Sequence, residues 1–262
     1  MHDLIDIGAN LTHDSFDRDR DEVIAAAAAV GVRRMMVTGA SSDGSRQAAA
    51  LAEANPGVLW ATAGVHPHHA SEYIAETTEL LTSLAEQTNV VAVGECGLDY
   101  FRNFSPVEAQ QDAFAAQLDI AVSNQKPVFL HQRDAHDDFV SILGSRMSQI
   151  SGGVAHCFTG KRAEMEEYLE MGLYIGVTGW VCDERRGHDL QDAVPHLPLD
   201  RLLLETDAPY LVPRDLTEKM PARRNEPRVL PHVLRAVARL MDRDETEVAA
   251  AATRNTEQLF GV

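Results

Sequence analysis

The sequence is poor in cysteine and has no long apolar run. Its three cysteines, Cys96, Cys157 and Cys182, lie far apart with no CxxC pair, which favours free thiols in a reducing compartment over disulfides or a cysteine zinc site. No run reaches the roughly 18 apolar residues of a membrane span, and no basic-then-apolar signal peptide is seen. We therefore expect a cytoplasmic protein.

Positive charge is also scarce. The chain has 23 lysines and arginines against 40 aspartates and glutamates, a formal net charge of −17. This balance argues against a protein that holds nucleic acid by bulk electrostatics. It still allows a nucleic-acid enzyme whose basic residues are local and whose bound metal ion supplies positive charge.

Eight short apolar runs recur along the 262 residues, and most are separated by stretches of helical character. The runs cover residues 4–8, 34–39, 58–65, 90–95, 127–131, 153–158, 173–179 and 201–207. Alternating strands and helices predict a parallel sheet, and eight such units in this length indicate an α/β fold of the (β/α)8 TIM-barrel type. We expect a single domain over residues 1–262. An open doubly wound sheet is the alternative, weakened because no GxGxxG follows the first run.

Two local patterns refine this picture. Ser105, Pro106 and Glu108 form a helix-start signature, with Ser105 as N-cap, Pro106 at the first helical position and Glu108 closing a capping box. Residues 207–228 are too rich in proline for a helix and too long for a routine connection. In a barrel this segment lies at the catalytic rim.

Polar residues lie within the first predicted strand and at or near the carboxyl ends of several others. They are Asp6, His66, Glu95, His131, His156 and Asp207. One histidine at a strand end is most often structural, but barrel enzymes place their chemistry at the carboxyl ends of strands. Convergence of Glu95, His131, His156 and Asp207 on one mouth predicts a site for a divalent metal ion.

Several motifs resemble the TatD-type deoxyribonucleases, a family of metal-dependent hydrolases within the amidohydrolase-like barrels. The matching stretches are DIGANLT, TAGVHPH, VGECGLDYFRNF, PVFLHQRDA, HCFTG, YIGVTGWVCDERRG, LLLETDAPYLVPRDL and RRNEP, in the family's order over residues 5–227. VCDERRG and RRNEP resemble the branch that includes TatD itself.

The resemblance implies roles for individual residues. Glu95, His131, His156 and Asp207 match divalent metal ligands, and His66 matches a residue that contacts the substrate phosphate or assists catalysis. Family members remove nucleotides from DNA 3′ ends with Mg²⁺ and are associated with DNA repair or degradation. The expected substrate is single-stranded DNA, and we expect a monomer.

Phosphodiester hydrolysis gives these groups specific tasks. We assign catalysis to Asp207, His66 and Glu95. Asp207 could accept a proton from the attacking water, and a protonated His66 or His68 could assist the leaving oxyanion. We expect Mg²⁺, with Mn²⁺ and Zn²⁺ as alternatives, because a set of His, Glu and Asp ligands serves all three.

Substrate binding needs cations at the rim despite the acidic chain. The predicted contacts are His66, His68, Arg133, Arg185, Arg186 and Arg224, and Arg214, Arg223 and Arg228 fall in rim loops as well. Arg133 could equally well form a salt bridge to Asp134 or another acid instead of binding phosphate. Tyr100, Phe101 and Tyr210 could stack on bases, whereas Phe104 and Trp180 are expected in the core.

Three residues beside the proposed ligands are interpreted as structural. Glu205 shares a strand face with Asp207 but lies deeper, so we expect a paired acid. Cys96 and Cys157 are expected to face the helices, because neighbouring residues of a strand point to opposite faces.

Two other function classes compete. A small-molecule amidohydrolase or lactonase of the related barrels would carry a carboxylated lysine on strand four, where this chain has Glu95. A degenerate, non-enzymatic scaffold is disfavoured because His66, the carboxylates and both other histidines are all present.

The first strand departs from the related barrels. Many of them carry His-x-His at its end, where this chain has Gly8 and Asn10 after Asp6. A glycine cannot bind metal, and an amide is a weak ligand. We therefore predict one tightly held ion, and a weak Mg²⁺-type second position near Asp6 and Asn10.

Overall fold

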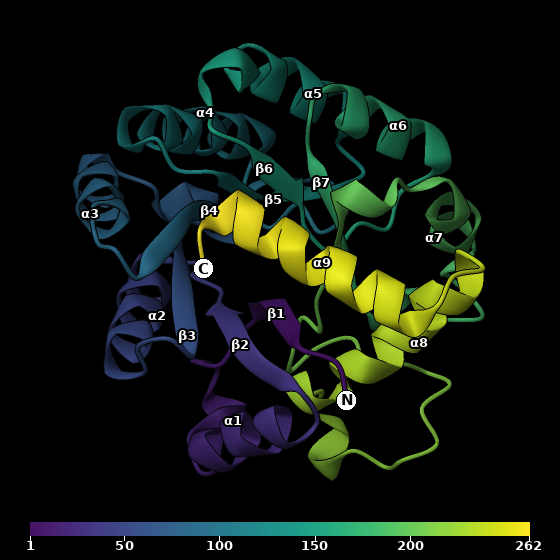
Figure 1. The fold of residues 1–262 in the computed structure, drawn as a ribbon. Helices are drawn as coiled ribbons and strands as arrows, with labels where there is room; N and C mark the ends of the chain where they lie inside the picture. Colours follow the sequence, from purple (N-terminus) through teal and green to yellow (C-terminus); the bar gives the residue numbers. More distant parts are fainter.

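The computed structural model describes residues 1–262, apart from the side chain of Pro221. In this described chain, eight parallel strands follow one another in sequence order around a barrel (Figure 1). They are β1 (Leu4–Ala9), β2 (Val32–Val37), β3 (Leu59–Ala63), β4 (Val90–Asp99), β5 (Val128–Arg133), β6 (Gly153–Ala155), β7 (Tyr174–Val177) and β8 (Leu202–Leu204).

The first strand, β1, and the end of the last strand, β8, meet. The backbone N–H of Asp207 donates to the carbonyl of Gly8 at 2.8 Å, and that of Asn10 donates to the carbonyl of Ala208 at 2.7 Å. These bonds bring the end of β8 against β1 and nearly close the barrel. The predicted TIM barrel is confirmed, and the open-sheet alternative is wrong because its first and last strands would not pair in this way.

Helices surround the strands. The α-helices are α1 (Arg20–Ala29), α2 (Ser42–Ala54), α3 (Ala75–Ala85), α4 (Val107–Asn124), α5 (His136–Gly144), α6 (Arg162–Glu170), α7 (His188–Ala193), α8 (Leu230–Leu240) and α9 (Glu245–Phe260). Short 3-10 turns are η1 (Asp14–Phe16), η2 (Pro67–Glu72), η3 (Met147–Gln149), η4 (Gly179–Cys182), η5 (Val194–His196), η6 (Leu199–Arg201), η7 (Pro221–Arg223) and η8 (Pro227–Val229). Among the described residues, no helix is long and apolar enough to cross a membrane.

The apolar residues form two clusters. The larger one fills the space between the barrel wall and its helices. The smaller one lies inside the barrel, where Ile7, Phe129 and Leu203 pack with Phe260 of α9. In Figure 1, α9 (yellow) lies across this end of the barrel. The polar residues of the predicted site lie at the opposite end, where the strands run into their loops.

The start of α4 differs from the predicted capping box. Pro106 occupies the N-cap position, and the side chain of Ser105 does not cap the helix. Instead, the Ser105 hydroxyl donates to the carbonyl of His68 at 3.0 Å and accepts from the backbone N–H of Ser71 at 3.1 Å. The prediction failed because a tertiary partner competes for the hydroxyl, which here fixes the loop after β3.

Candidate metal centre

The loop after β3 is held by a buried glutamine. Gln117 of α4 accepts from the backbone N–H of Val65 at 2.7 Å and donates to its carbonyl at 3.1 Å. The next residue, His66, accepts a hydrogen bond from the backbone N–H of His68 at its Nδ1, 3.1 Å away. In a neutral ring the proton must therefore be on Nε2.

Glu95 lies at the centre of the site. The sequence predicted that its strand ends there, but β4 continues to Asp99 because Cys96 to Asp99 pair in register with Leu130 to Arg133 of β5. Glu95 is thus a residue of the barrel wall, and its carboxylate points at a ring of histidines.

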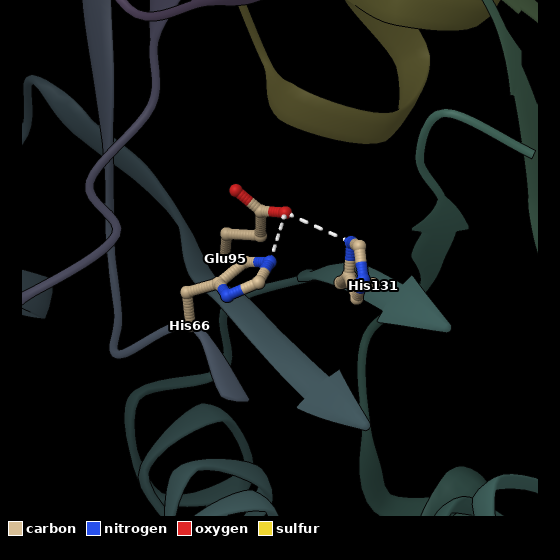
Figure 2. A group of neighbouring side chains, drawn as sticks. All are labelled: His66, Glu95 and His131. Atoms are coloured by element: carbon tan, nitrogen blue, oxygen red, sulfur yellow. Dashed lines mark ion pairs between the residues drawn. The ribbon is translucent and has the colours of Figure 1, made fainter. Parts of the chain in front are cut away.

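Three imidazoles surround one oxygen of that carboxylate. Glu95 Oε1 lies 3.0 Å from His156 Nε2, 3.1 Å from His131 Nδ1 and 3.4 Å from His66 Nε2. Figure 2 shows His66 and His131 pointing at this oxygen from two sides. The group comes from β4, β5, the loop after β3 and the turn after β6.

Burial and neighbouring charges set the protonation of these groups. Burial alone would raise the pKa of Glu95, but His66 and His156 hold it well below its ordinary value. Burial opposes charge on His156, yet Glu205 and Glu95 raise its pKa well above the ordinary value. Burial lowers the pKa of His66 to about 3. A neutral His66 at pH 7 differs from the protonated acid considered from the sequence, and the cause is its desolvation.

A second carboxylate orients His156 from behind. Glu205 Oε2 lies 2.9 Å from His156 Nδ1, and Glu205 Oε1 accepts from the backbone N–H of Cys157. Glu205 is fully buried, so it is the paired, deep acid expected from the sequence. An acid behind a histidine fixes which ring nitrogen carries the proton and leaves the other free for a ligand.

Asp99 lies beside His131 and pairs with His68. Its Oδ2 lies 2.7 Å from His68 Nε2, and it lies 3.6 Å from His131 Nε2, too far for a hydrogen bond. The Asp99 backbone N–H donates to Gln110 of α4 at 2.8 Å. Sequence reasoning missed Asp99 because it ended strand four too early. The alternation of Glu95, Gly97 and Asp99 along one strand face was the available signal.

Asp207 approaches from the far side of the mouth. Asn10 Nδ2 donates to Asp207 Oδ1 at 3.0 Å and to the carbonyl of Ala208 at 3.2 Å. Burial raises the pKa of Asp207 to about 7, against the opposing charge of His156. Asp207 has a φ of 54°, in the left-handed region that Asp tolerates better than most residues.

Asp6 lies deeper than Asn10 and has other partners. Its fully buried carboxylate accepts from the backbone N–H and hydroxyl of Thr206 and from the backbone N–H of Gly8. A ligand role for Asp6 would require it to give up these bonds. The weak second position therefore stays a prediction, with Asn10 and Asp207 as the pair that faces the mouth.

The donor set fits a divalent ion. Ligand atoms about 2.1 Å from one ion lie about 3.0–3.4 Å from one another, which matches the spacing of the nitrogens around Glu95. Among the described residues of the mouth, the compact group of possible ligand atoms that all lie within 4.8 Å of one another comprises His66, Glu95 and His131, and the predicted ligands His156 and Asp207 lie outside it. His66 differs from the other two, because its Nε2 carries the proton and suits a donor better than a ligand.

A polar cavity of 480 Å³ lies at the end of β5, where Gln132 and Arg133 follow His131. Arg133, Lys161, Trp180 and Arg186 are among its lining residues. The guanidinium carbons of Arg133 and Arg186 lie 5.4 Å and 4.5 Å from the centre of the Trp180 ring. Such cation–π contacts fix both arginines against the ring. Trp180 is half-buried, and it packs against the larger core cluster as well as lining the cavity.

The other predicted substrate contacts are ion-paired within the protein. Arg185 and Arg186 both reach Asp183, at 3.4 Å and 3.3 Å. Arg224 binds Asp19 at 2.8 Å and Glu226 at 2.7 Å, and its side chain is only 10% exposed. Its role in substrate binding stays a prediction.

Two side chains differ in orientation from expectation. Phe104 was expected in the core but is 68% exposed, and its ring packs 4.7 Å from that of His68. Cys157 was expected to face the helices, as buried Cys96 does. With a φ of 46°, Cys157 breaks the strand alternation after β6, and its Sγ lies 3.7 Å from Thr178 Oγ1 beside the mouth.

Comparisons with known proteins agree with this geometry. A family model described as TatD related DNase matches residues 5–261. A relative named 3′-5′ ssDNA/RNA exonuclease TatD, from Citrobacter rodentium, is 52% identical over 99% of this chain and 98% of its own length. One of the same name from Erwinia tasmaniensis is 51% identical over 99% of this chain and 100% of its length.

Solved structures give the same result. YJJV, a TatD homologue from Escherichia coli K12, superposes with a TM-score of 0.91 at 31% identity, over 99% of this chain and 98% of that one. A TatD family hydrolase from Entamoeba histolytica superposes with a TM-score of 0.88 at 27% identity, with the same coverage. The family model spans nearly the whole chain, and so do the relatives; this protein belongs to the TatD related DNase family.

Proposed function

We propose that the protein is a metal-dependent 3′-to-5′ exonuclease that hydrolyses phosphodiester bonds in single-stranded DNA or RNA. The observation that carries the proposal is the buried Glu95 carboxylate, with three imidazole nitrogens within 3.4 Å of one oxygen at the barrel mouth. Family membership supplies the reaction class, and the names of the relatives supply the substrate and direction.

The metal ligands in this proposal are Glu95, His131, His156 and Asp207, and the ion is Mg²⁺, with Mn²⁺ or Zn²⁺ as alternatives. When bound, such an ion supplies positive charge to the phosphate and lowers the pKa of a water molecule. Glu205 keeps the Nε2 atom of His156 directed at Glu95, and the carboxylate of Asp99 lies 3.6 Å from the far nitrogen of His131. The barrel wall holds these groups rigidly, so little reorganisation is needed when substrate arrives.

Asp207 and His66 have complementary tasks. Asn10 fixes one oxygen of Asp207, and the other oxygen can accept a proton from the attacking water. His66 directs its Nε2–H into the site, which suits donation to a phosphoryl or leaving oxygen. The Asp99–His68 pair lies beside it, with the centre of the His68 ring 4.2 Å from that of His66.

The cavity beside β5 provides room for the rest of the substrate. Arg133 and Arg186 can contact the phosphate backbone, while Trp180 and the 58% exposed Phe101 offer aromatic faces to bases. Single strands suit this arrangement because their bases are free to stack. Residues 1–262 would act as one domain, since the strands and the closing helix α9 share one barrel.

The test is release of mononucleotides from 3′-labelled and 5′-labelled single-stranded DNA and RNA in Mg²⁺, with EDTA as the metal-free control. We expect the 3′ label to be released first, and EDTA to abolish the reaction. Asp207→Ala should lower the rate at least about 10³-fold. Absence of release by the wild type, or equal release by Asp207→Ala, would overturn the proposal. Amide and lactone substrates serve as the panel for the competing hydrolase class.

A further inference from the structure

A second group of side chains that could bind a metal ion lies outside the catalytic mouth. Cys182 ends η4 after β7, Asp215 lies in the rim segment 207–228, and His232 is in the first turn of α8. One ligand atom from each residue can be chosen so that all lie within 4.8 Å of one another. The sequence disfavoured a cysteine zinc site because no CxxC is present, but here the fold gathers ligands from three separate elements.

The chemistry of the three side chains points to a soft divalent ion. A thiolate, an imidazole and a carboxylate are the ligand types of Zn²⁺, with water completing a tetrahedron, whereas Mg²⁺ avoids sulfur. We propose that Cys182, Asp215 and His232 bind one Zn²⁺ ion, which ties the rim segment to α8 and to the turn after β7. The proposal is independent of the nuclease activity, because these residues take no part in the catalytic centre.

The Asp215–His232 pair needs only a small adjustment to bind one ion, and the Cys182 thiol lies within 4.8 Å of a ligand atom of each. His232 Nε2 lies 2.7 Å from Asp215 Oδ1, as a hydrogen bond. Two such atoms around one tetrahedral Zn²⁺ stand about 3.4 Å apart, and a thiolate and an imidazole stand about 3.6 Å apart. The hydrogen bond must therefore open by under an ångström, within the freedom of a surface carboxylate.

Access and charge are compatible with an ion. Cys182 is buried at 7% exposure, while the side chains of His232 and Asp215 are 19% and 43% exposed, so the site opens to solvent on the Asp215 side. Thiolate and carboxylate together neutralise a divalent cation. Burial and the neighbouring Asp215 raise the pKa of Cys182 to about 12, against the opposing charge of Arg239, so the thiol gives up its proton only when the ion binds.

The site has a consequence for the rim. Asp183, which follows Cys182, holds both Arg185 and Arg186, and Arg186 packs on Trp180 of the same turn. An ion bound to Cys182 would hold this turn, and with it Arg185 and Arg186, in one position. Zn²⁺ would thus act as a structural clip beside the substrate cavity, distinct from the ion used in catalysis.

Cobalt substitution tests the proposal, because Co²⁺ bound to a thiolate gives a near-ultraviolet charge-transfer absorption that nitrogen and oxygen ligands do not. Chelator-treated full-length protein in excess Mg²⁺ is titrated with Co²⁺ and then with Zn²⁺. We expect one equivalent of thiolate-bound Co²⁺, displaced by Zn²⁺, with release of the thiol proton measured by a pH indicator. The melting temperature should rise with Zn²⁺.

Matched variants locate the ion. Cys182→Ala should abolish the absorption, whereas Cys157→Ala, which removes the thiol beside the catalytic mouth, should keep it. His232→Ala and Asp215→Asn change more exposed side chains and should weaken Co²⁺ binding at least about tenfold, so they decide the matter if Cys182→Ala fails to fold. No thiolate absorption, or an absorption unchanged in His232→Ala, would overturn the proposal.

Discussion

Glu205 orients a residue of the predicted metal site without being one of the predicted ligands. It contacts the far nitrogen of His156 and the backbone of Cys157, so both of its oxygens face N–H donors. Glu205→Gln keeps the shape but turns an amide NH₂ toward one of these donors. We predict a roughly 10–100-fold loss of metal affinity and activity, measured from the Mg²⁺ dependence of nucleotide release.

The control for this change is Glu170→Gln, the same substitution at an exposed position of α6. It should leave the Mg²⁺ dependence unchanged. A Glu205→Gln enzyme that is less stable but needs no more Mg²⁺ would show that Glu205 serves folding alone.

A glycine is needed at position 8 for a steric reason that the sequence did not reveal. A Cβ at this position would lie 2.4 Å from Glu205 Oε2, and a Cβ at Gly176 would lie 2.4 Å from Glu205 Oε1. The two glycines therefore make room for the buried acid. The sequence showed that a histidine is missing at Gly8, but only the structure shows that a carboxylate occupies the space.

Adding that methyl group should be costly. We predict that Gly8→Ala lowers the free energy of unfolding by about 1–3 kcal/mol, as measured by urea denaturation. Gly144→Ala is the matched control, because its nearest new contact would be 4.0 Å away at the exposed end of α5. Equal stability of the two variants would mean that Glu205 can move aside without loss.

At the scale of elements, ion pairs join the rim segment to the start of α1. Both oxygens of Asp19, the N-cap residue of α1, bind Arg224, at 2.9 Å and 2.8 Å. Arg224 also packs 4.6 Å from the centre of the Phe16 ring. The rim segment is thus anchored at one end by a bidentate pair.

This pair predicts a pH dependence of stability. The hydrogen bond from Arg224 lowers the pKa of Asp19 from its ordinary 3.8. The unfolded chain therefore takes up the proton first, so the stabilisation is complete above pH 3.8 and is lost as the pH falls further. Asp19→Asn should be less stable by about 1 kcal/mol near pH 7. The gap to wild type should narrow as the pH falls below 3.8 in urea titrations.

Asp200→Asn, at an exposed position, provides the comparison and should show no such pH-dependent gap. A gap for Asp19→Asn that persists undiminished at low pH would rule out the ion pair as its origin.

The order and type of the elements followed from the sequence because apolar periodicity and glycine stops are local signals. The end of β4 did not, since its last residues are fixed by pairing with β5. The role of Ser105 was missed for the same reason, because its partners belong to another loop. Local pattern thus located Glu95 and the histidines, whereas Asp99, Gln110 and Gln117 act through contacts that only the folded chain creates.

For the whole molecule, net charge should shape how substrate arrives. A chain of formal charge −17 repels a polyanion at long range, while Arg185 and Arg186 share one Asp183. Raising ionic strength from about 0.01 M to about 0.15 M shortens the Debye length from about 30 Å to about 8 Å. We predict that kcat/KM for single-stranded DNA rises or stays level over this range at fixed Mg²⁺.

Proteins that bind DNA through many phosphate contacts show the opposite, a steep fall with salt. A dinucleotide substrate is the control, because its small charge should give almost no salt effect. A steep fall for the long substrate would mean that the rim dominates the field despite the acidic chain.

The helix α9, which closes one end of the barrel, also affects how the chain folds during its synthesis. Arg34 of β2 binds Asp3 at 3.0 Å, Glu257 at 2.8 Å and the carbonyl of Val262 at 3.5 Å, and Thr253 of α9 donates to the carbonyl of Asp3. One edge of β1 pairs with β2 early in synthesis, but its other edge and the barrel floor wait for β8 and α9, which come more than 190 residues later. Until then the nascent barrel has two open edges and an uncovered apolar floor, the state in which newly made chains most readily associate wrongly.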